Sequence, residues 1–164
     1  MAFKPKKDEK LIVEIWTDGG CRSTAKKGET IKPTDRCAYA YFMKFGGQEK
    51  LGGAAGHGYT NNQMEIYAVL KALKSMKKYD VPVKVYSDSA YVVNCINQKW
   101  YVKWEKNGWT KKGGLANANL WKSLVDEIRK FPFFSIEKVK GHSGLNDGND
   151  IVDKHLNKLM DELG

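Results

Sequence analysis

Long apolar segments are missing from this chain of 164 residues. No run approaches the ~18 apolar residues that a membrane-spanning helix requires. Residues 1–10 (MAFKPKKDEK) also lack the apolar centre of a secretory signal. We therefore expect a cytoplasmic protein that does not enter a membrane, with a basic tail over 1–10 and one domain over 11–164.

Cysteine is scarce as well. The chain has Cys21, Cys37 and Cys95, an odd number without the spacing of a metal site. In a reducing compartment such residues are ordinary thiols, so we expect neither a disulfide nor a zinc site.

Acidic residues are too few to balance the basic ones. Lys and Arg number 28 against 19 Asp and Glu, which gives a formal charge of +9. An excess of this size favours a polyanionic partner such as nucleic acid, although many basic proteins bind none. Charge alone does not decide the function.

Hydrophobic periodicity predicts an α/β fold. Alternating apolar residues mark strands, and apolar residues at helical spacing mark helices. Thr60 and Gln63 have the spacing of a capping box at one helix start. Strands are expected at 11–17, 37–45, 46–56, 81–87 and 133–140, with a hairpin turn at 46–47, and helices at 60–79, 88–98, 116–131 and 150–163. This order predicts a five-stranded mixed sheet flanked by helices.

Four carboxylates lie near predicted strand ends and helix starts. Asp18 follows the first strand and precedes two glycines, and Asp88 directly follows the strand at 81–87. Glu65 lies one turn into its helix, and Asp153 lies in the first turn of the last helix. In α/β sheets these positions gather at one rim, where ligands bind.

Each of these acids also has an ordinary structural interpretation. Asp18 could be a turn residue, Asp88 an N-cap, and Glu65 a favourable charge near a helix start. Asp153 could be a solvated surface residue. If the four meet, however, they repel one another unless divalent cations neutralise them. Oxygen ligands without His or Cys favour Mg²⁺, with Mn²⁺ as a substitute.

The segment 98–114 (QKWYVKWEKNGWTKKGG) combines aromatic and basic residues. It holds three of the five tryptophans and has five lysines against one glutamate. If 99–106 is helical, Trp100 and Trp104 share one stripe and the lysines form the next. Tryptophans at such spacing could belong to the core. Their interleaving with lysine favours a nucleic-acid surface, where cations meet phosphates and rings meet sugars and bases.

Five blocks, in this order, resemble the type 1 ribonuclease H family, which cleaves the RNA strand of RNA/DNA hybrids. They are TDGGC, TNNQMEIYAVLKAL, VYSDSAYVVN, WYVKWEKNGW and VKGHSGLNDGNDIVD, and they extend from about Leu11 to the last helix. The resemblance implies a ribonuclease H-like fold and an endonuclease that leaves 5′-phosphate and 3′-hydroxyl ends. It assigns Asp18, Glu65, Asp88 and Asp153 as catalytic ligands of two Mg²⁺ ions.

The resemblance also implies residues that handle the substrate. His142, in a glycine-flanked loop, would assist proton transfer at the leaving group or product release, although a histidine in such a loop is often only solvated. We expect a monomer that binds an RNA/DNA hybrid duplex. The implied nucleic-acid contacts are Thr60, Asn61, Asn62, Lys99, Trp100, Lys103, Trp104, Lys106, Trp109 and Asn117.

Some features depart from the family pattern. The segment 22–36 is long and polar and lacks a compact glycine-rich turn, and Gly58 offers no side chain where some relatives have a phosphate-binding arginine.

Two other functions also stay open. One is a different carboxylate-and-metal nuclease or strand transferase, and the other is a hybrid-binding module without catalysis.

Overall fold

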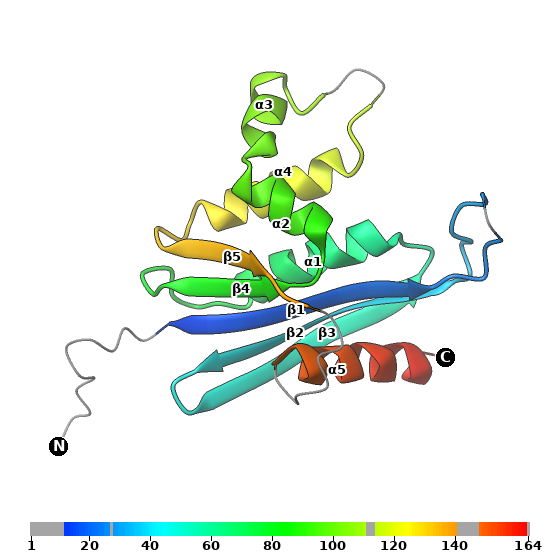
Figure 1. Ribbon diagram of the computed structural model, residues 1–164, viewed down its shortest axis with the longest axis horizontal. Coiled ribbons are helices and arrows are strands. Elements are labelled where there is room, and N and C mark those ends of the chain that lie inside the picture. The colour runs from blue at the N-terminus through cyan, green and yellow to red at the C-terminus, as the bar shows by residue number, and fades with distance from the viewer. Residues whose placement is uncertain (1–11, 27, 111–113, 141–147, 164) are drawn as a thin grey trace.

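One five-stranded sheet organises the chain, and helices cover both of its faces (Figure 1). The computed structural model describes residues 12–26, 28–110, 114–140 and 148–163. The strands are β1 (Val13–Arg22), β2 (Arg36–Phe45), β3 (Gln48–His57), β4 (Val83–Ser87) and β5 (Phe134–Lys138). The helices are α1 (Asn61–Lys74), α2 (Ala90–Asn97), α3 (Trp100–Lys106), α4 (Ala118–Ile128) and α5 (Gly148–Glu162). The predicted α/β class with a five-stranded mixed sheet is confirmed.

The strands lie in the order β3-β2-β1-β4-β5. β1 pairs antiparallel with β2, and β2 with β3. β1 pairs parallel with β4, and β4 with β5. The hairpin between β2 and β3 turns at Gly46 and Gly47, as predicted, and Gly46 has a φ of +60°. β1 therefore lies at the centre, where the antiparallel and parallel halves meet.

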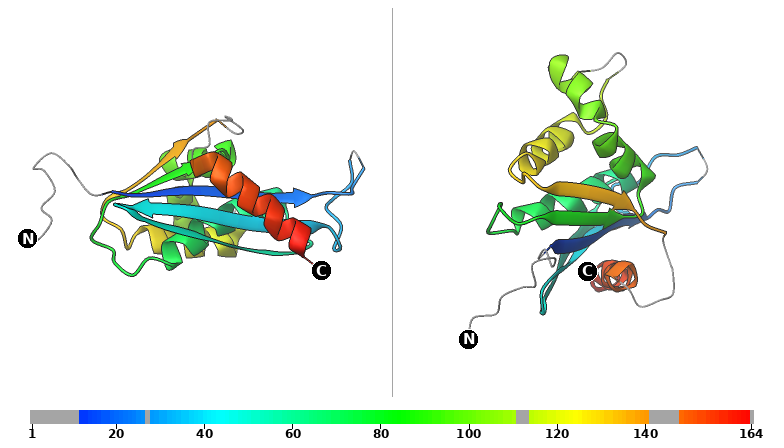
Figure 2. Two further views of the ribbon diagram at one scale, coloured as in Figure 1. Left: turned by 90° about the horizontal axis from the view of Figure 1, so that it is seen from below. Right: turned by 60° about the vertical axis from the view of Figure 1, so that its left-hand side comes forward.

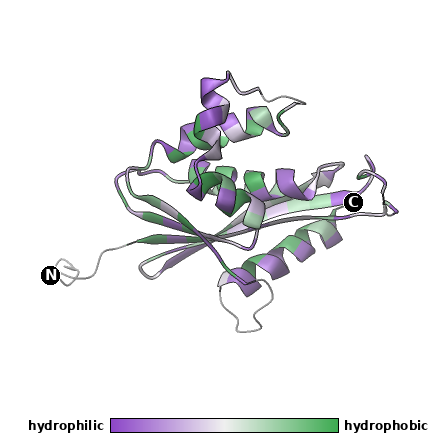
Figure 3. Cartoon of the chain, turned by 45° about the horizontal axis from the view of Figure 1, so that its top comes forward, coloured by the Kyte–Doolittle hydropathy of each residue, from purple (hydrophilic) through white to green (hydrophobic). Residues whose placement is uncertain are grey.

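Two hydrophobic clusters hold the layers together. The larger one joins the sheet to α1, α2 and α4 and includes Leu73, Val85 and Trp121, all fully buried. The smaller one joins β2 to the apolar side of α5, including Val152 and Leu156. Figure 2 shows α5 on one face of the sheet and the other helices on the opposite face, and Figure 3 shows hydrophilic and hydrophobic residues along α5.

β1 is longer than the sequence indicated. We expected a strand over 11–17 that ends at Asp18, and a turn was one of the two interpretations of Asp18. Instead the residues from Asp18 to Arg22 pair with β2, so the strand end at Asp18 is wrong. Gly19 shows why this stretch contains glycine, because a Cβ there would lie 2.3 Å from the carbonyl carbon of Met64 in α1. Gly19 therefore serves a close helix–strand contact rather than a turn, whereas a Cβ at Gly20 would make only ordinary van der Waals contacts, the nearest with Leu156 Cδ2 at 3.6 Å.

The observed starts of α1, α2 and α5 test three expectations from the sequence. Thr60 caps α1 with the predicted capping box: the Gln63 N–H donates to Thr60 Oγ1 at 3.0 Å, and the Thr60 N–H donates to Gln63 Oε1 at 2.9 Å. The N-cap of α2 is Ser89, so Asp88 is not a cap. Because α5 extends back to Gly148, Asp153 lies beyond its first turn, and that expected position was wrong.

Within the described ranges, none of the helices has the length and apolar character needed to span a bilayer.

Candidate active site

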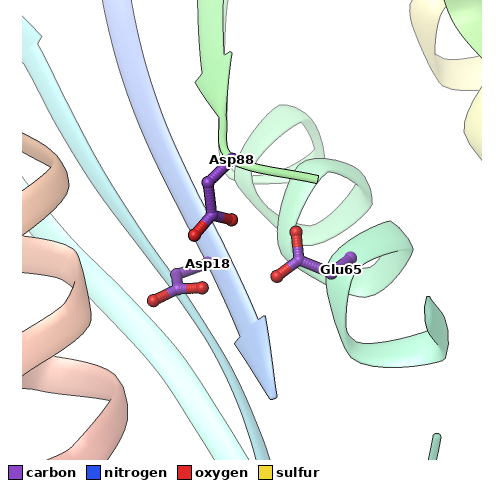
Figure 4. Close-up of side chains that lie close together, drawn as sticks. All are labelled: Asp18, Glu65 and Asp88. Carbon is purple, nitrogen blue, oxygen red and sulfur yellow. The ribbon is translucent and has the colours of Figure 1, made fainter. Parts of the chain in front are cut away.

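Three carboxylates from three elements meet beside the end of β4 (Figure 4). Asp18 lies on β1, Glu65 on α1, and Asp88 directly after β4. Each offers a carboxylate oxygen, and these oxygens all lie within 4.8 Å of one another. The strand register explains why Asp18 and Asp88 are neighbours. Thr17 is paired with Ser87 in the parallel ladder of β1 and β4, so the residues that directly follow them, Asp18 and Asp88, lie side by side.

Glu65 is held against β1 by the backbone. The Gly19 N–H donates to Glu65 Oε1 at 2.7 Å and to Asp18 Oδ1 at 2.9 Å, so one donor orients both acids. The Ser87 hydroxyl donates to Glu65 Oε2 at 3.4 Å while its oxygen accepts the N–H of Ser89 at 3.1 Å. Sequence reasoning missed both positioning groups. The only feature of the sequence that could have indicated them is that Gly19 directly follows Asp18 and Ser87 directly precedes Asp88.

Asp153 approaches the cluster from the opposite face of the sheet. It is half-buried on α5, and both its charge and a side-chain hydrogen bond act on Asp18. Its main-chain oxygen accepts a hydrogen bond from Asn157 Nδ2 at 3.0 Å. The other three acids predicted from the sequence, Glu65, Asp88 and Asp153, therefore all act on Asp18.

Two arginines at the ends of segment 22–36 anchor α5. Arg22 Nη1 lies 2.6 Å from Asp161 Oδ1, and its Nη2 donates to the carbonyl of Asn157 at 3.2 Å. Arg36 Nη1 donates to the carbonyl of Met160 at 3.0 Å. This polar segment thereby helps to fix the helix that carries Asp153.

Burial and mutual repulsion control the protonation of the cluster. Burial, and then the charges of Asp88 and Asp153, raise the pKa of Asp18 to about 7. Burial, and then Asp18 and Asp88, raise the pKa of Glu65 well above its ordinary value, against the opposing effect of the Gly19 N–H. Near neutral pH the cluster therefore retains protons in the absence of a cation.

The donor set fits a hard divalent cation. Asp18, Glu65 and Asp88 offer carboxylate oxygens within 4.8 Å of one another, and Asp18 and Glu65 are only 6% and 7% exposed. Asp153 adds a fourth carboxylate, whose charge acts on Asp18. Buried acids that repel one another at this range are stabilised by a bound cation, and oxygen ligands match Mg²⁺ or Mn²⁺. These residues could hold a metal.

The predicted basic surface lies on α3, which stands away from the sheet (Figure 1). Lys99 at the N-cap of α3, and Lys103 and Lys106 within it, are together called the α3 lysines, and all three are exposed. Trp100 is 43% exposed, whereas Trp104 and Trp109 pack against the hydrophobic core. The ring centroid of Trp104 lies 5.8 Å from that of Trp121. The core interpretation therefore holds for Trp104 and Trp109 but not for the exposed Trp100.

A hollow of about 780 Å³ lies along α3, and its lining includes Lys99, Trp100, Lys103 and Trp104. The half-buried Trp104 therefore still presents part of its surface to this hollow. The hollow offers both cations and aromatic surface, which is the combination used for single nucleic-acid strands.

The other predicted contacts lie around the start of α1. Thr60, Asn61 and Asn62 are exposed there. Asn117 is half-buried at the N-cap of α4, with a φ of +61°, and lines the groove between α1 and α4 together with Gln63. The structure thus brings Asn117 near the α1 terminus, although 117 and 60 are far apart in sequence.

Gly58 has a backbone reason to be glycine. Its φ is +79°, and an added Cβ would lie 3.1 Å from the Cα of Pro33. His142, the remaining predicted catalytic residue, lies outside the described residues.

Comparison with known proteins identifies the family. The RNase H family model matches residues 10–160. The chain belongs to the RNase H family. Ribonuclease H of Clostridium botulinum strain Hall is 42% identical over 153 residues, which covers 92% of this chain and 97% of that protein.

Solved structures of RNase H proteins share the fold. The RNase H domain of PFV superposes with a TM-score of 0.71 and 23% identity, covering 95% of this chain and 98% of that one. LC11-RNase H1, solved in complex with an RNA/DNA hybrid, gives a TM-score of 0.64 and 18% identity, covering 92% and 97%. The expected ribonuclease H-like fold is confirmed.

Proposed function

We propose that this protein is an endoribonuclease that hydrolyses the RNA strand of RNA/DNA hybrids and leaves 5′-phosphate and 3′-hydroxyl ends. The observation that carries the proposal is the cluster of Asp18, Glu65 and Asp88, whose carboxylate oxygens lie within 4.8 Å of one another in a chain of the RNase H family. A hybrid-binding module without catalysis has no need of buried acids that repel one another. Residues 11–164 would form one catalytic domain.

Asp18, Glu65, Asp88 and Asp153 would hold two Mg²⁺ ions, with Mn²⁺ as a substitute. When bound, the metal supplies an activated water and stabilises the leaving oxygen. The protein's own contribution is to fix the acids in place: the Gly19 N–H orients Asp18 and Glu65, and Ser87 supports Glu65. A rigid set of carboxylates favours one geometry at the scissile phosphate.

The α3 lysines and Trp100 would hold one strand of the duplex. The lysines offer charge to phosphates, and the exposed ring of Trp100 offers a stacking surface. Trp104 and Trp109 would contribute mainly by supporting this surface from the core side. The hybrid in the LC11-RNase H1 structure supports this class of ligand by analogy of fold.

A second set of contacts would come from the α1 and α4 termini. Thr60, Asn61 and Asn62 offer hydroxyl and amide groups at an exposed helix start, and Asn117 lines the adjacent groove. Helix N-termini favour phosphate oxygens because their N–H groups point outward. These residues would therefore fix the register of the duplex relative to the acids.

His142 would assist proton transfer at the leaving group or the release of product. An imidazole titrates near pH ~6.5, which suits either task. We further infer that the protein acts as a monomer in the cytoplasm.

The test is cleavage of a labelled RNA/DNA hybrid in the presence of Mg²⁺, with duplex RNA, duplex DNA and EDTA as controls. We expect cleavage of the hybrid's RNA strand alone and none in EDTA. Chemical analysis of the ends should find 5′-phosphate and 3′-hydroxyl. Cleavage of duplex DNA would favour a different metal nuclease or a strand transferase. Binding without cleavage would favour a hybrid-binding module.

A further inference from the structure

Cys21 and Cys37 lie opposite each other in the sheet. They are Cα partners in the antiparallel register of β1 and β2, so their side chains leave the same face. Sequence spacing gave no sign of this pairing, because the polar segment 22–36 separates the two residues.

The hydrogen-bond pattern shows which kind of pair this is. The Cys21 N–H donates to Asn61 Oδ1 at 2.8 Å and therefore points away from β2. Two residues earlier, the Gly19 N–H also points away from β2, toward Glu65. Cys21 and Cys37 thus form a non-hydrogen-bonded pair, in which Cα atoms are typically about 4.5 Å apart. That separation lies within the range that a disulfide can bridge.

Both thiols already converge on one atom. Cys21 Sγ donates to the carbonyl oxygen of Tyr59 at 2.9 Å, and Cys37 Sγ donates to the same oxygen at 3.0 Å. Tyr59 directly precedes Thr60, the N-cap of α1. The two sulfurs therefore meet beneath the start of α1.

The thiols differ in access. Cys21 is partly exposed, whereas Cys37 is completely buried. Cys95 is also buried, but it lies on α2 within the larger hydrophobic cluster. A small oxidant would therefore reach Cys21 first, and Cys37 is the thiol that can respond.

We propose that Cys21 and Cys37 are an oxidation site. Oxidation forms a cross-strand disulfide between them and thereby weakens the binding of nucleic acid by the residues at the start of α1. The oxidant is a low-molecular-weight disulfide. Its sulfur–sulfur bond breaks as Cys21 Sγ attacks, which releases one small thiol and forms a mixed disulfide. Cys37 Sγ then attacks the Cys21 sulfur and releases the second small thiol. The two protons of the protein thiols leave on these products, so the oxidant is reduced and the cysteine pair is oxidised.

Formation of the disulfide affects α1 through two contacts. It removes both S–H donors from the Tyr59 carbonyl, and it constrains Cys21, whose N–H donates to Asn61 Oδ1. Thr60 and Asn61 are among the residues proposed above to contact the nucleic acid. The expected loss of hybrid affinity therefore rests on the proposed function. Burial and the neighbouring Cys37 raise the pKa of the Cys21 thiol. Because the thiolate is the attacking form, closure should become faster as pH rises.

The experiment treats the purified full chain with oxidised glutathione and then titrates free thiols after denaturation. We expect the number of free thiols to fall from three to one, and peptide mapping to join the Cys21 peptide to the Cys37 peptide. Dithiothreitol should restore all three. Cys21→Ser should prevent the bridge, whereas the matched control Cys95→Ala should still form it. Retention of three thiols, or a bridge that includes Cys95, would overturn the site.

Hybrid affinity is then measured in EDTA for both forms. We expect the oxidised form to bind about fivefold more weakly, an effect the size of losing one helix cap. The same treatment should leave the affinity of Cys21→Ser unchanged. A bridged protein with unaltered affinity would refute the coupling to α1. If the reduced protein fails to bind any hybrid, the proposed function is wrong, while the thiol titration still decides whether the bridge forms.

Discussion

Removing one negative charge from the acid cluster should stabilise the metal-free protein. Asp18 has its pKa raised from 3.8 to about 7 by burial and by its acidic neighbours. Between these two values the folded chain binds more protons than the unfolded chain, so the free energy of unfolding falls as pH rises through this window. Asp18→Asn abolishes that penalty, and its amide oxygen can still accept the Gly19 N–H.

The size of the effect follows from the same pKa. At ~1.4 kcal/mol per pKa unit, an increase from 3.8 to about 7 corresponds to at most about 4 kcal/mol at high pH. Glu65 and Asp88 still repel each other in the variant, so we expect a gain of roughly 1–3 kcal/mol at pH 8 and almost none at pH 4. For a chain of this size, each kcal/mol raises the midpoint by about 2–4 °C.

The assay is thermal or urea unfolding of wild type and Asp18→Asn in EDTA at pH 4, 6 and 8. The stability difference should widen steadily with pH. Mg²⁺ should then raise the wild-type midpoint more than that of the variant, because a ligand bound at about 100 times its Kd adds ~2.7 kcal/mol to the folded state. A variant less stable than wild type in EDTA at pH 8 would refute the reasoning and make Asp18 chiefly a structural residue of β1.

Other substitutions separate chemistry from binding. Asp88→Asn should abolish cleavage but retain hybrid affinity, and residual cleavage within about tenfold of wild type would contradict the metal site. Charge-neutral replacement of the α3 lysines should lower the salt dependence of binding by roughly one unit per phosphate contact, whereas an unchanged slope would place them outside the interface. Trp100→Ala should weaken binding by ~1–3 kcal/mol without loss of stability, while Trp104→Ala should also lower the melting temperature because its ring packs against the core. His142→Ala should reduce turnover by ~10²–10⁴-fold and leave measurable activity, and complete inactivity would indicate a role other than proton transfer.

Local chemistry made parts of this protein predictable from sequence. The capping box of Thr60 and Gln63 fixes the start of α1 through bonds within four residues, and Gly46 and Gly47 fix the hairpin turn in the same local way. Hydrophobic period distinguished strands from helices. The four acids could be selected by residue type and by the family resemblance, although the expected positions of Asp18 at a strand end and of Asp153 in a first turn were wrong.

Features that depend on a partner strand or helix were not predictable. β1 continues past Asp18 only because β2 supplies hydrogen bonds as far as Arg22. Trp100 and Trp104 share a helical stripe, yet only Trp104 packs on Trp121, a contact set by the placement of α4.

The same distinction applies within the site itself. Which side chains can carry metal chemistry follows from residue type, and residue type is read directly from the sequence. In contrast, the orientation of two acids by Gly19 and the pairing of Cys21 with Cys37 became visible in the fold, because both depend on strand register and on the close approach of α1. Register is fixed by pairing between distant segments, so no short stretch of sequence contains it.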